Sequence, residues 1–295
     1  MSARSVPDVS PGSPEWLALI TASKVPAILG LSPWESRFSL WHRMAGYAPP
    51  QAENTETRRG HYLEPAICQW FADQHPDMTV LNSGTFVRDD DPTSAATPDR
   101  LLIDCGLVHS ALEVKTSSSD EGWGPSGSTE IPVYYNAQVQ WQMYVLDLTH
   151  VHVAVLTSFL EFRQYRIPRS DEDITFIQSE VAKFRASLVS NERPDIDDHS
   201  STLTVIREMH PDIDGTDVEI DADLADQYRA ARSAATAAKA QEAAMTATVS
   251  DALGNGRRAV VGPDRIAMRV PGRGSNPPYL KACPTPKTTP LEKTA

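Results

Sequence analysis

Cysteine is scarce in this 295-residue chain, which contains only Cys68, Cys105 and Cys283. Three widely separated thiols can supply neither a disulfide framework nor the four ligands of a cysteine-based zinc or iron–sulfur site. The eight histidines are also dispersed, without the spacing typical of zinc ligands. We therefore expect no iron–sulfur cluster.

Long hydrophobic runs are also missing. No apolar stretch approaches the roughly 20 residues that a helix needs to span a bilayer. Residues 1–14 lack the basic and apolar blocks of a signal peptide. The sequence thus predicts a cytoplasmic protein with no membrane partner, in the host bacterial cytoplasm if the gene is phage-borne.

Positive charge is in short supply, because 27 Lys and Arg face 39 Asp and Glu for a net charge of −12. Phosphate binding relies on Lys and Arg, so this balance argues at first against a nucleic-acid partner. The deficit is concentrated, however: residues 195–226 hold eleven acids and one base, Arg207. The rest is nearly neutral, and a DNA partner is still possible if local basic patches hold it.

The pattern of apolar residues divides the chain into four parts. Helical and strand periodicities continue to Arg193-Pro194, which predicts a core domain over residues 1–194. Residues 195–221 are expected to form an acidic connector. Residues 222–272 read as an alanine-rich helix followed by a small hairpin, and residues 273–295 as a disordered tail rich in Pro, Thr and Lys.

The strongest chemical signal lies in two neighbouring apolar segments. Asp99 and Glu113 are separated by about the length of a tight hairpin, so adjacent strands can bring both carboxylates to one hard-cation site. Lys115 follows Glu113 by two residues and shares its face of a strand, while Leu112 and Val114 point to the core. We expect Asp99, Glu113 and the Val114 carbonyl to bind Mg²⁺ or Mn²⁺, and Lys115 to position or activate water. The plainer interpretation is an ion pair at a strand edge.

Further residues are candidates for the same site. Glu64, at the edge of a helical stripe, is expected to hold a second metal ion, although a solvated glutamate is the plainer alternative. Gln138 is expected to orient water or the scissile phosphate, and Ser23 to cap a helix whose N-terminus can cradle phosphate. The remaining candidates for contact with DNA or its phosphates are Thr21, Arg58, Arg59, Tyr135 and Gln140.

Taken together, these segments resemble the YqaJ-type viral recombinases, the lambda-exonuclease-like branch of the PD-(D/E)XK nucleases. The resemblance covers roughly residues 14–189, with motifs in this order: Ile20-Thr21-Ala22-Ser23, Leu29-Gly30-Leu31-Ser32-Pro33-Trp34, Arg59-Gly60-His61-Tyr62-Leu63-Glu64-Pro65, Thr97-Pro98-Asp99, Leu112-Glu113-Val114-Lys115 and Tyr135-Asn136-Ala137-Gln138-Val139-Gln140.

The resemblance implies an α/β fold in which helices flank a restriction-endonuclease-like mixed central sheet, here with a C-terminal helical and hairpin appendage. It implies Mg²⁺-dependent 5′ to 3′ digestion of linear double-stranded DNA, with 3′ single-stranded overhangs as products for phage-type recombination. Members of the family act beside a single-strand annealing protein, and some form toroidal trimers, which makes a homo-oligomer an expectation here.

The sequence departs from the family pattern at two points. An arginine that often precedes the Ile-Thr-Ala-Ser segment and binds the terminal 5′ phosphate is replaced by the stretch Glu15-Trp16-Leu17-Ala18-Leu19. The usual glycine after Pro-Asp is Arg100. Two alternatives stand beside the exonuclease: a RecB-type or CRISPR-associated nuclease, disfavoured by the dispersed cysteines, and a catalytically silent DNA-binding scaffold of the same fold.

Overall fold

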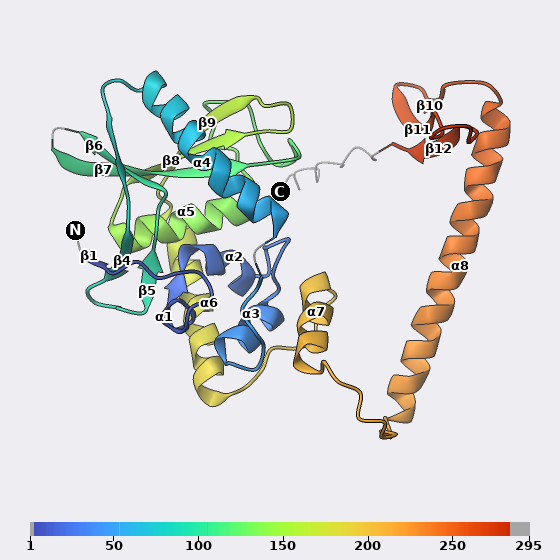
Figure 1. Cartoon of the computed structure of the whole chain (residues 1–295), viewed down its shortest axis with the longest axis horizontal. Coiled ribbons are helices and arrows are strands. Elements are labelled where there is room, and N and C mark those ends of the chain that lie inside the picture. The colour runs from blue at the N-terminus through green and yellow to red at the C-terminus, as the bar shows by residue number, and fades with distance from the viewer. Residues whose placement is uncertain (1–2, 53, 105, 284–295) are drawn as a thin grey trace, which may run out of the picture. The chain divides into compact units, whose positions relative to one another are not determined.

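The computed structural model describes residues 3–52, 54–104 and 106–283 of the chain (Figure 1). Two compact units are formed, Met1–Ile213 and Asp214–Ala295. The first unit is a mixed α/β domain that contains all the candidate site residues, and the second consists of one long helix and a small sheet.

A five-stranded sheet forms the centre of the first unit, in the order β3 (Thr79–Asn82), β6 (Arg100–Asp104), β7 (Leu107–Thr116), β8 (His150–Leu156) and β9 (Phe162–Pro168). All neighbours are antiparallel except β7 and β8, which are parallel. A parallel pair needs a crossover connection, and helix α5 (Val133–Leu146) supplies it.

Alternation along β7 assigns its residues to two faces of this sheet. Leu112 and Val114 pack with Phe71 of helix α4 (Thr55–Gln74) on one face. Ala111 packs with residues of α5 on the other (Figure 1). Because Glu113 and Lys115 have the parity of Ala111, the fold directs both charged side chains toward α5.

A smaller sheet lies beside α5, with strands in the order β1 (Ala3–Val6), β4 (Thr85–Arg88), β5 (Ser94–Ala96) and β2 (Ile20–Thr21). The pattern over Thr79–Val87 reads as one strand in the sequence, but the structure divides it between β3 of the central sheet and β4 of this sheet. The Ser83-Gly84 step breaks the extended run, and each half pairs with a different partner.

Short helices and one long helix complete the first unit. Helix α6 (Asp171–Ser190) begins at Ser170, whose side chain accepts a hydrogen bond from the Asp173 amide, as the capping pattern predicts. Its buried Ile177, Val181 and Phe184 pack against α5. The remaining elements are α1 (Pro14–Leu17), the 3₁₀ turn η1 (Ala22–Lys24), α2 (Val25–Ile28) and α3 (Arg37–Met44).

The boundary of the first unit differs from the expected one. The compact unit extends to Ile213 rather than to residue 194, because the segment expected to be an acidic connector contains helix α7 (Ser200–Met209). Val205 of α7 is buried against Phe38 of α3. The hydroxyls of Ser36 and Thr202 are 2.6 Å apart across this contact.

The second unit contains the predicted alanine-rich helix and hairpin. Helix α8 (Ala222–Leu253) is followed by an antiparallel sheet of β10 (Arg258–Val261), β11 (Asp264–Val270) and β12 (Tyr279–Ala282). The third strand lies within the expected disordered tail and pairs with β11, so the tail prediction is wrong for that stretch; residues 284–295 lie outside the described part. Over the described residues, no helix combines the length and apolarity needed to cross a membrane, α8 included.

Candidate functional site

Asp99, Glu113 and Lys115 converge where β6 and β7 pair. Register pairs Arg100 with Leu112, so Asp99 immediately precedes the paired stretch and lies beside the Glu113 position. The Asp99 Oδ2 atom accepts a hydrogen bond of 2.6 Å from the Val114 backbone amide. The Lys115 Nζ atom donates a short hydrogen bond to Glu113 Oε1. The three ionisable groups predicted from spacing therefore form one cluster.

Two glutamines on α5 hold the Glu113 carboxylate. The Gln138 side-chain amide donates to Oε1 at 2.5 Å, and that of Gln142 donates to Oε2 at 2.6 Å. Residues four apart share one face of a helix, so both amides reach the same carboxylate. The structure thus shows Gln138 bound to Glu113. Gln142 is a further residue of this site that the sequence motifs did not identify, although it lies four residues after Gln138 and so shares its helix face.

The cluster holds two acidic groups in a largely dry environment. Glu113 is only 3% exposed. Burial, and then repulsion by the Glu113 carboxylate, raise the pKa of Asp99 well above its ordinary value. Burial alone would lower the pKa of Lys115, but the carboxylates of Glu113 and Asp99 outweigh it and raise this pKa above that of a solvated lysine. Lys115 is therefore an ammonium at neutral pH.

The residues of this cluster fit a hard divalent cation. Carboxylate oxygens are the ligands that Mg²⁺ and Mn²⁺ prefer, and the raised Asp99 pKa marks repulsion between two carboxylates that a cation would relieve. Only Asp99 and Glu113 offer acidic ligands here: over the described residues, no three His, Cys, Asp or Glu side chains come together as a metal-binding group. Asp99 and Glu113 supply acidic ligands for one ion, and a second ion at Glu64 stays a prediction.

Glu64 is bound to a different partner. Its Oε1 atom lies 2.8 Å from Nη1 of Arg100, which also donates to the Asp99 carbonyl oxygen at 2.5 Å. Arg100 is the register partner of Leu112 and so shares the sheet face that packs on α4, whereas Glu113 faces α5. Glu64 still lies near the cluster, because its charge is among the causes that raise the pKa of Asp99.

Aromatic rings cover the Lys115 side of the cluster. The Lys115 Nζ atom lies 4.9 Å from the centre of the Tyr135 ring. Tyr135 in turn contacts Trp123, Tyr134 and Trp34. Trp123 lies in a segment rich in Gly and Ser, a composition that predicts an exposed flexible loop, but it is 7% exposed and packs between Tyr135 and Tyr165. Burial of its large ring fixes the Gly-rich segment.

The Thr21–Ser23 segment lies next to the strand that leads to Asp99. Strand β2 runs parallel to β5, with Thr21 opposite Ala95, and the hydroxyls of Thr21 and Ser23 are 3.0 Å apart. Ser23 is exposed, while Thr21 is buried. The Trp141 indole N–H is 3.2 Å from the carbonyl oxygens of both Ile20 and Ala95, so α5 fixes this segment as well as Glu113.

Lys24 is a buried lysine that the sequence motifs did not identify. It donates to the carbonyl oxygens of Trp16 and Leu19 at 2.6 and 2.7 Å and lies 3.8 Å from the centre of the Trp16 ring. Burial lowers the pKa of Lys24 to about 7, against the opposing charge of Glu35. Its donors bind carbonyls at the end of α1 and just before β2, so Lys24 organises the connection between these elements.

The other expected DNA contacts separate into two groups. Arg58 and Arg59 are exposed on α4, shortly before Glu64 in the sequence. The adjacent Gly60 lies close to the end of β7, because a Cβ added to it would be 4.0 Å from the Thr116 side chain. Gln140, in contrast, is 2% exposed. Its amide donates to the Pro168 carbonyl at 3.0 Å and accepts from the Ser170 amide, so it joins β9 to α6 instead of facing DNA.

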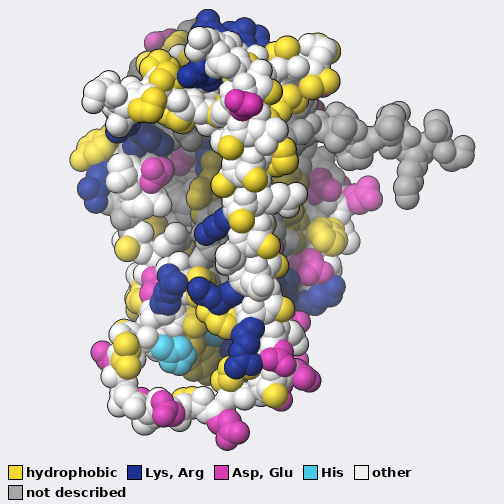
Figure 2. Space-filling view, turned by 90° about the vertical axis from the view of Figure 1, so that its right-hand side faces the viewer, with side chains coloured by type: hydrophobic (Ala, Val, Ile, Leu, Met, Phe, Trp, Pro, Cys, Tyr) yellow, Lys and Arg dark blue, Asp and Glu magenta, His cyan; other side chains and the backbone are white. Residues whose placement is uncertain are grey.

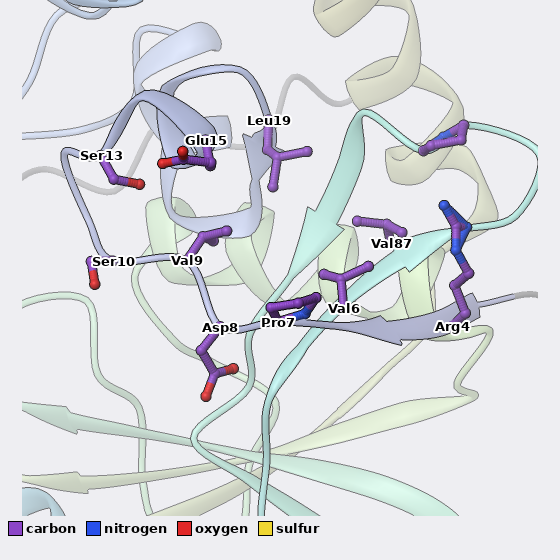
Figure 3. Close-up of a pocket in the computed structure, with 11 residues that line it drawn as sticks. Arg4, Val6, Pro7, Asp8, Val9, Ser10, Ser13, Glu15, Leu19 and Val87 are labelled. Carbon is purple, nitrogen blue, oxygen red and sulfur yellow. The ribbon is translucent and has the colours of Figure 1, made fainter.

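A hollow of about 460 Å³ lies elsewhere, between the N-terminal strand, α1 and β4. Figure 3 shows Val6, Val9, Leu19 and Val87 around it, while the Asp8 carboxylate is directed away. Asp8 accepts a hydrogen bond of 3.1 Å from the Thr85 amide. None of the candidate site residues lines this hollow, so it is separate from the acidic cluster.

Comparison with known proteins gives one family and several similar chains. Residues 15–151 match the YqaJ-like viral recombinase domain. The uncharacterized protein YqaJ of Bacillus subtilis (strain 168) is 25% identical over 206 residues, which is 66% of this chain and 63% of that protein. This chain therefore spans less than two thirds of the length of that relative.

Two similar solved structures are exonucleases. An alkaline exonuclease from Laribacter hongkongensis is 20% identical with a TM-score of 0.44, over 59% of this chain and 90% of that one. A phage-related exonuclease from Haemophilus somnus 129PT is 13% identical with a TM-score of 0.44, over 59% and 96% of the two chains. The family match spans α1 through the start of β8 and includes every residue of the acidic cluster. Over residues 15–151, this chain is therefore similar to the YqaJ-like viral recombinase domain.

Proposed function

We propose that this chain is a metal-dependent deoxyribonuclease that digests linear double-stranded DNA from 5′ ends and leaves 3′ single-stranded overhangs. The observation that carries the proposal is the buried Glu113 carboxylate, which lies beside Asp99 and is held by Lys115, Gln138 and Gln142. A buried carboxylate pair with a fixed ammonium is costly unless it serves a cation or a reaction. The family of residues 15–151 supports a role in DNA recombination.

In this proposal, Asp99 and Glu113 hold Mg²⁺ or Mn²⁺, which supplies Lewis-acid stabilisation of charge on the scissile phosphate. The Val114 carbonyl is the remaining proposed ligand from this strand. Val114 also holds Asp99 next to Glu113 and Lys115, because the Val114 amide donates a hydrogen bond to the Asp99 carboxylate. A second ion at Glu64 is not part of the proposal, since Arg100 already neutralises that carboxylate.

Lys115 acts as a cation and hydrogen-bond donor. Its Nζ atom donates to Glu113 Oε1, and from this position Lys115 is proposed to orient the attacking water or support its deprotonation and to stabilise negative charge on the phosphate. Gln138 and Gln142 restrict Glu113 to one rotamer, so that the acidic oxygens are preorganised before substrate arrives.

The substrate is proposed to lie against exposed groups near this cluster. Ser23 offers a hydroxyl on the segment fixed by Trp141, and Arg58 and Arg59 offer guanidinium groups on α4. Tyr135 and its aromatic neighbours provide a surface for a base or sugar beside Lys115. A single-strand annealing protein that takes up the 3′ overhang is the proposed partner.

The test is digestion of end-labelled linear duplex DNA by the purified chain with Mg²⁺. We expect nucleotides to be released from 5′ ends while a closed circular duplex of the same sequence survives. Duplexes with 5′-phosphate and 5′-hydroxyl ends test whether the chain selects phosphorylated ends without the missing arginine. Equal cutting of circles would refute exonuclease action.

Two variants connect that activity to the cluster. Glu113→Gln and Lys115→Met are each expected to slow digestion by roughly a hundredfold or more, because each removes a preorganised charge. Lys183→Met, which removes a lysine paired with Glu180 on the surface of α6, is the matched control. Circular dichroism must show that all three chains remain folded, and wild-type digestion by Glu113→Gln would reject the proposed centre.

A further inference from the structure

Positive charge gathers in one short part of this acidic chain. Residues 254–283 contain six basic residues and one acid, Asp264, whereas residues 1–253 contain 19 Lys or Arg against 37 Asp or Glu. The six basic residues belong to β10, β11, β12 and their connections: Arg257, Arg258, Arg265, Arg269, Arg273 and Lys281. A catalytic unit of strongly negative charge repels DNA, so this sheet is the natural electrostatic contact with a polyanion.

The strand register places cations and exposed rings on the same face. Arg258 pairs with Met268, and Met268 pairs with Lys281, so these three side chains project from the same side of the sheet. Two residues along, Val270 pairs with Tyr279 on that side, and Ile266 has the parity of Met268. We call this surface the Arg258–Lys281 face.

The Arg258–Lys281 face is the open side of the sheet. Tyr279 is 55% and Ile266 is 48% exposed, and both Arg258 and Lys281 are exposed. The opposite side is partly covered: Ala267 is 4% exposed, and the Arg269 guanidinium donates to the Gly254 carbonyl at the end of α8. Figure 2 shows dark blue Lys and Arg side chains next to yellow hydrophobic ones over this sheet, at the top of the view.

The basic residues of this sheet, including Arg258 and Lys281 of this face, are not neutralised by the described part of the chain. No ion pair among residues 3–52, 54–104 and 106–283 involves Arg257, Arg258, Arg265, Arg273 or Lys281. Basic side chains that flank an exposed aromatic ring and an aliphatic side chain on a flat sheet match the chemistry of a single nucleic-acid strand. Phosphates bind the cations, and bases, freed from pairing, stack on the ring.

We propose that the Arg258–Lys281 face binds single-stranded DNA. The inference rests on the proposed function for the source of the strand, which is the 3′ overhang that digestion would leave. A paired duplex hides its base faces within the stack and cannot use Tyr279 in this way, so the exposed ring favours the single strand over the duplex.

The test measures binding separately from digestion. Fluorescence anisotropy of a labelled 20-nucleotide oligo-dT is followed with the full chain in EDTA, with a salt titration, beside a blunt hairpin duplex of equal phosphate number. We expect Arg258→Ala/Lys281→Ala to weaken oligo-dT binding at least tenfold and to reduce the slope of log affinity against log salt by about 1.4, since each single-strand phosphate contact contributes about 0.7.

Two further variants separate stacking from charge and local charge from overall charge. Tyr279→Ala is expected to weaken oligo-dT binding about tenfold without changing the salt slope, because stacking releases no counterions. Arg229→Ala/Arg232→Ala removes the same charge from exposed α8 of the same unit and is expected to leave affinity within about twofold of wild type.

Three results would overturn the proposal: equal losses in the two double variants, tighter binding of the hairpin duplex than of oligo-dT, or stronger binding to vesicles of anionic phospholipid than to oligo-dT. Digestion and oligo-dT binding by the wild-type chain separate this inference from the proposed function. A wild-type chain that digests no DNA in Mg²⁺ but still binds oligo-dT through Arg258 and Lys281 would refute the nuclease and retain this inference. The reverse pattern would refute this inference alone.

Discussion

The Arg100 guanidinium lies 2.8 Å from the Glu64 carboxylate and also donates to the Asp99 carbonyl oxygen, so this ion pair lies next to the acidic cluster. Both side chains are mostly shielded from solvent, so the pair is screened less than a surface one. The charge of Arg100 competes with any cation that Glu64 could bind.

Removing this arginine should therefore open a second metal site. We expect Arg100→Ala to raise the number of Mn²⁺ ions bound per chain from one toward two, as measured by isothermal titration calorimetry without DNA. The double variant Arg100→Ala/Glu64→Gln should return to one ion. One ion in both variants would mean that Glu64 lies outside the reach of the metal.

The two glutamines of α5 should affect the rate of digestion. Gln142→Leu and Gln138→Leu each remove one hydrogen bond to a buried carboxylate, an interaction worth about 1.5–3 kcal/mol. We expect the kcat of each variant to fall roughly 10- to 100-fold. Gln140→Leu removes an amide of the same helix that binds Pro168, and it should lower the melting temperature while leaving the rate per folded molecule near wild type.

Stability at low pH should depend on Asp91. Burial acts to raise the pKa of Asp91, but hydrogen bonds from Ser94, Arg185 and Thr93 outweigh it and hold the value at about 2. Because this pKa is depressed relative to the unfolded value of 3.8, the stabilisation is complete above pH 4 and is lost as pH falls toward 2.

The corresponding variant is Asp91→Asn. It should lower the free energy of unfolding by about 1–2 kcal/mol at pH 7 and by much less at pH 2, as measured by urea denaturation at a series of pH values. Asp77→Asn provides the charge-matched comparison. A loss for Asp91→Asn that stayed constant from pH 7 to pH 2 would assign the effect to packing rather than to the carboxylate charge.

The loop that carries Trp123 should contribute to stability. Trp123 is 7% exposed and packs on Tyr135 and Tyr165, so Trp123→Ala is expected to cost about 3–5 kcal/mol in chemical denaturation. Trp70, which is 44% exposed and stacks on Phe162, should cost about 1 kcal/mol when replaced by Ala. If Trp123→Ala cost no more unfolding free energy than Trp70→Ala, Trp123 would be as exposed to solvent as the composition of its Gly-rich segment suggests.

The sequence alone predicts the parts of the fold that depend on local periodicity. The alternation through Leu112-Glu113-Val114-Lys115 places Glu113 and Lys115 on one side of β7, and the helical spacing of Ile174, Ile177, Val181 and Phe184 with the Ser170 cap predicts α6. The association of Asp99 with this strand also follows, because a short antiparallel connection leaves few ways to pair the two segments.

Contacts between elements distant in sequence follow from tertiary packing. The sequence groups Gln138 with Gln140 in one motif, yet Gln138 and Gln142 bind Glu113, because two residues along a helix turn a side chain to nearly the opposite face. Trp123 lies in a segment of loop composition but is buried by rings from α5 and β9. Glu64 pairs with Arg100 because α4 covers the sheet face opposite the one that carries Glu113.

The amino-acid sequence thus determined on which face of its strand or helix each side chain lies. This was enough to predict the group of Asp99, Glu113 and Lys115. Only the packing of α4 and α5 on opposite faces of the sheet decided that Gln142 joins this group and that Glu64 pairs with Arg100. The physical reason is that backbone periodicity is set by neighbours along the chain, whereas the partner of a buried charge is set by whichever element covers it.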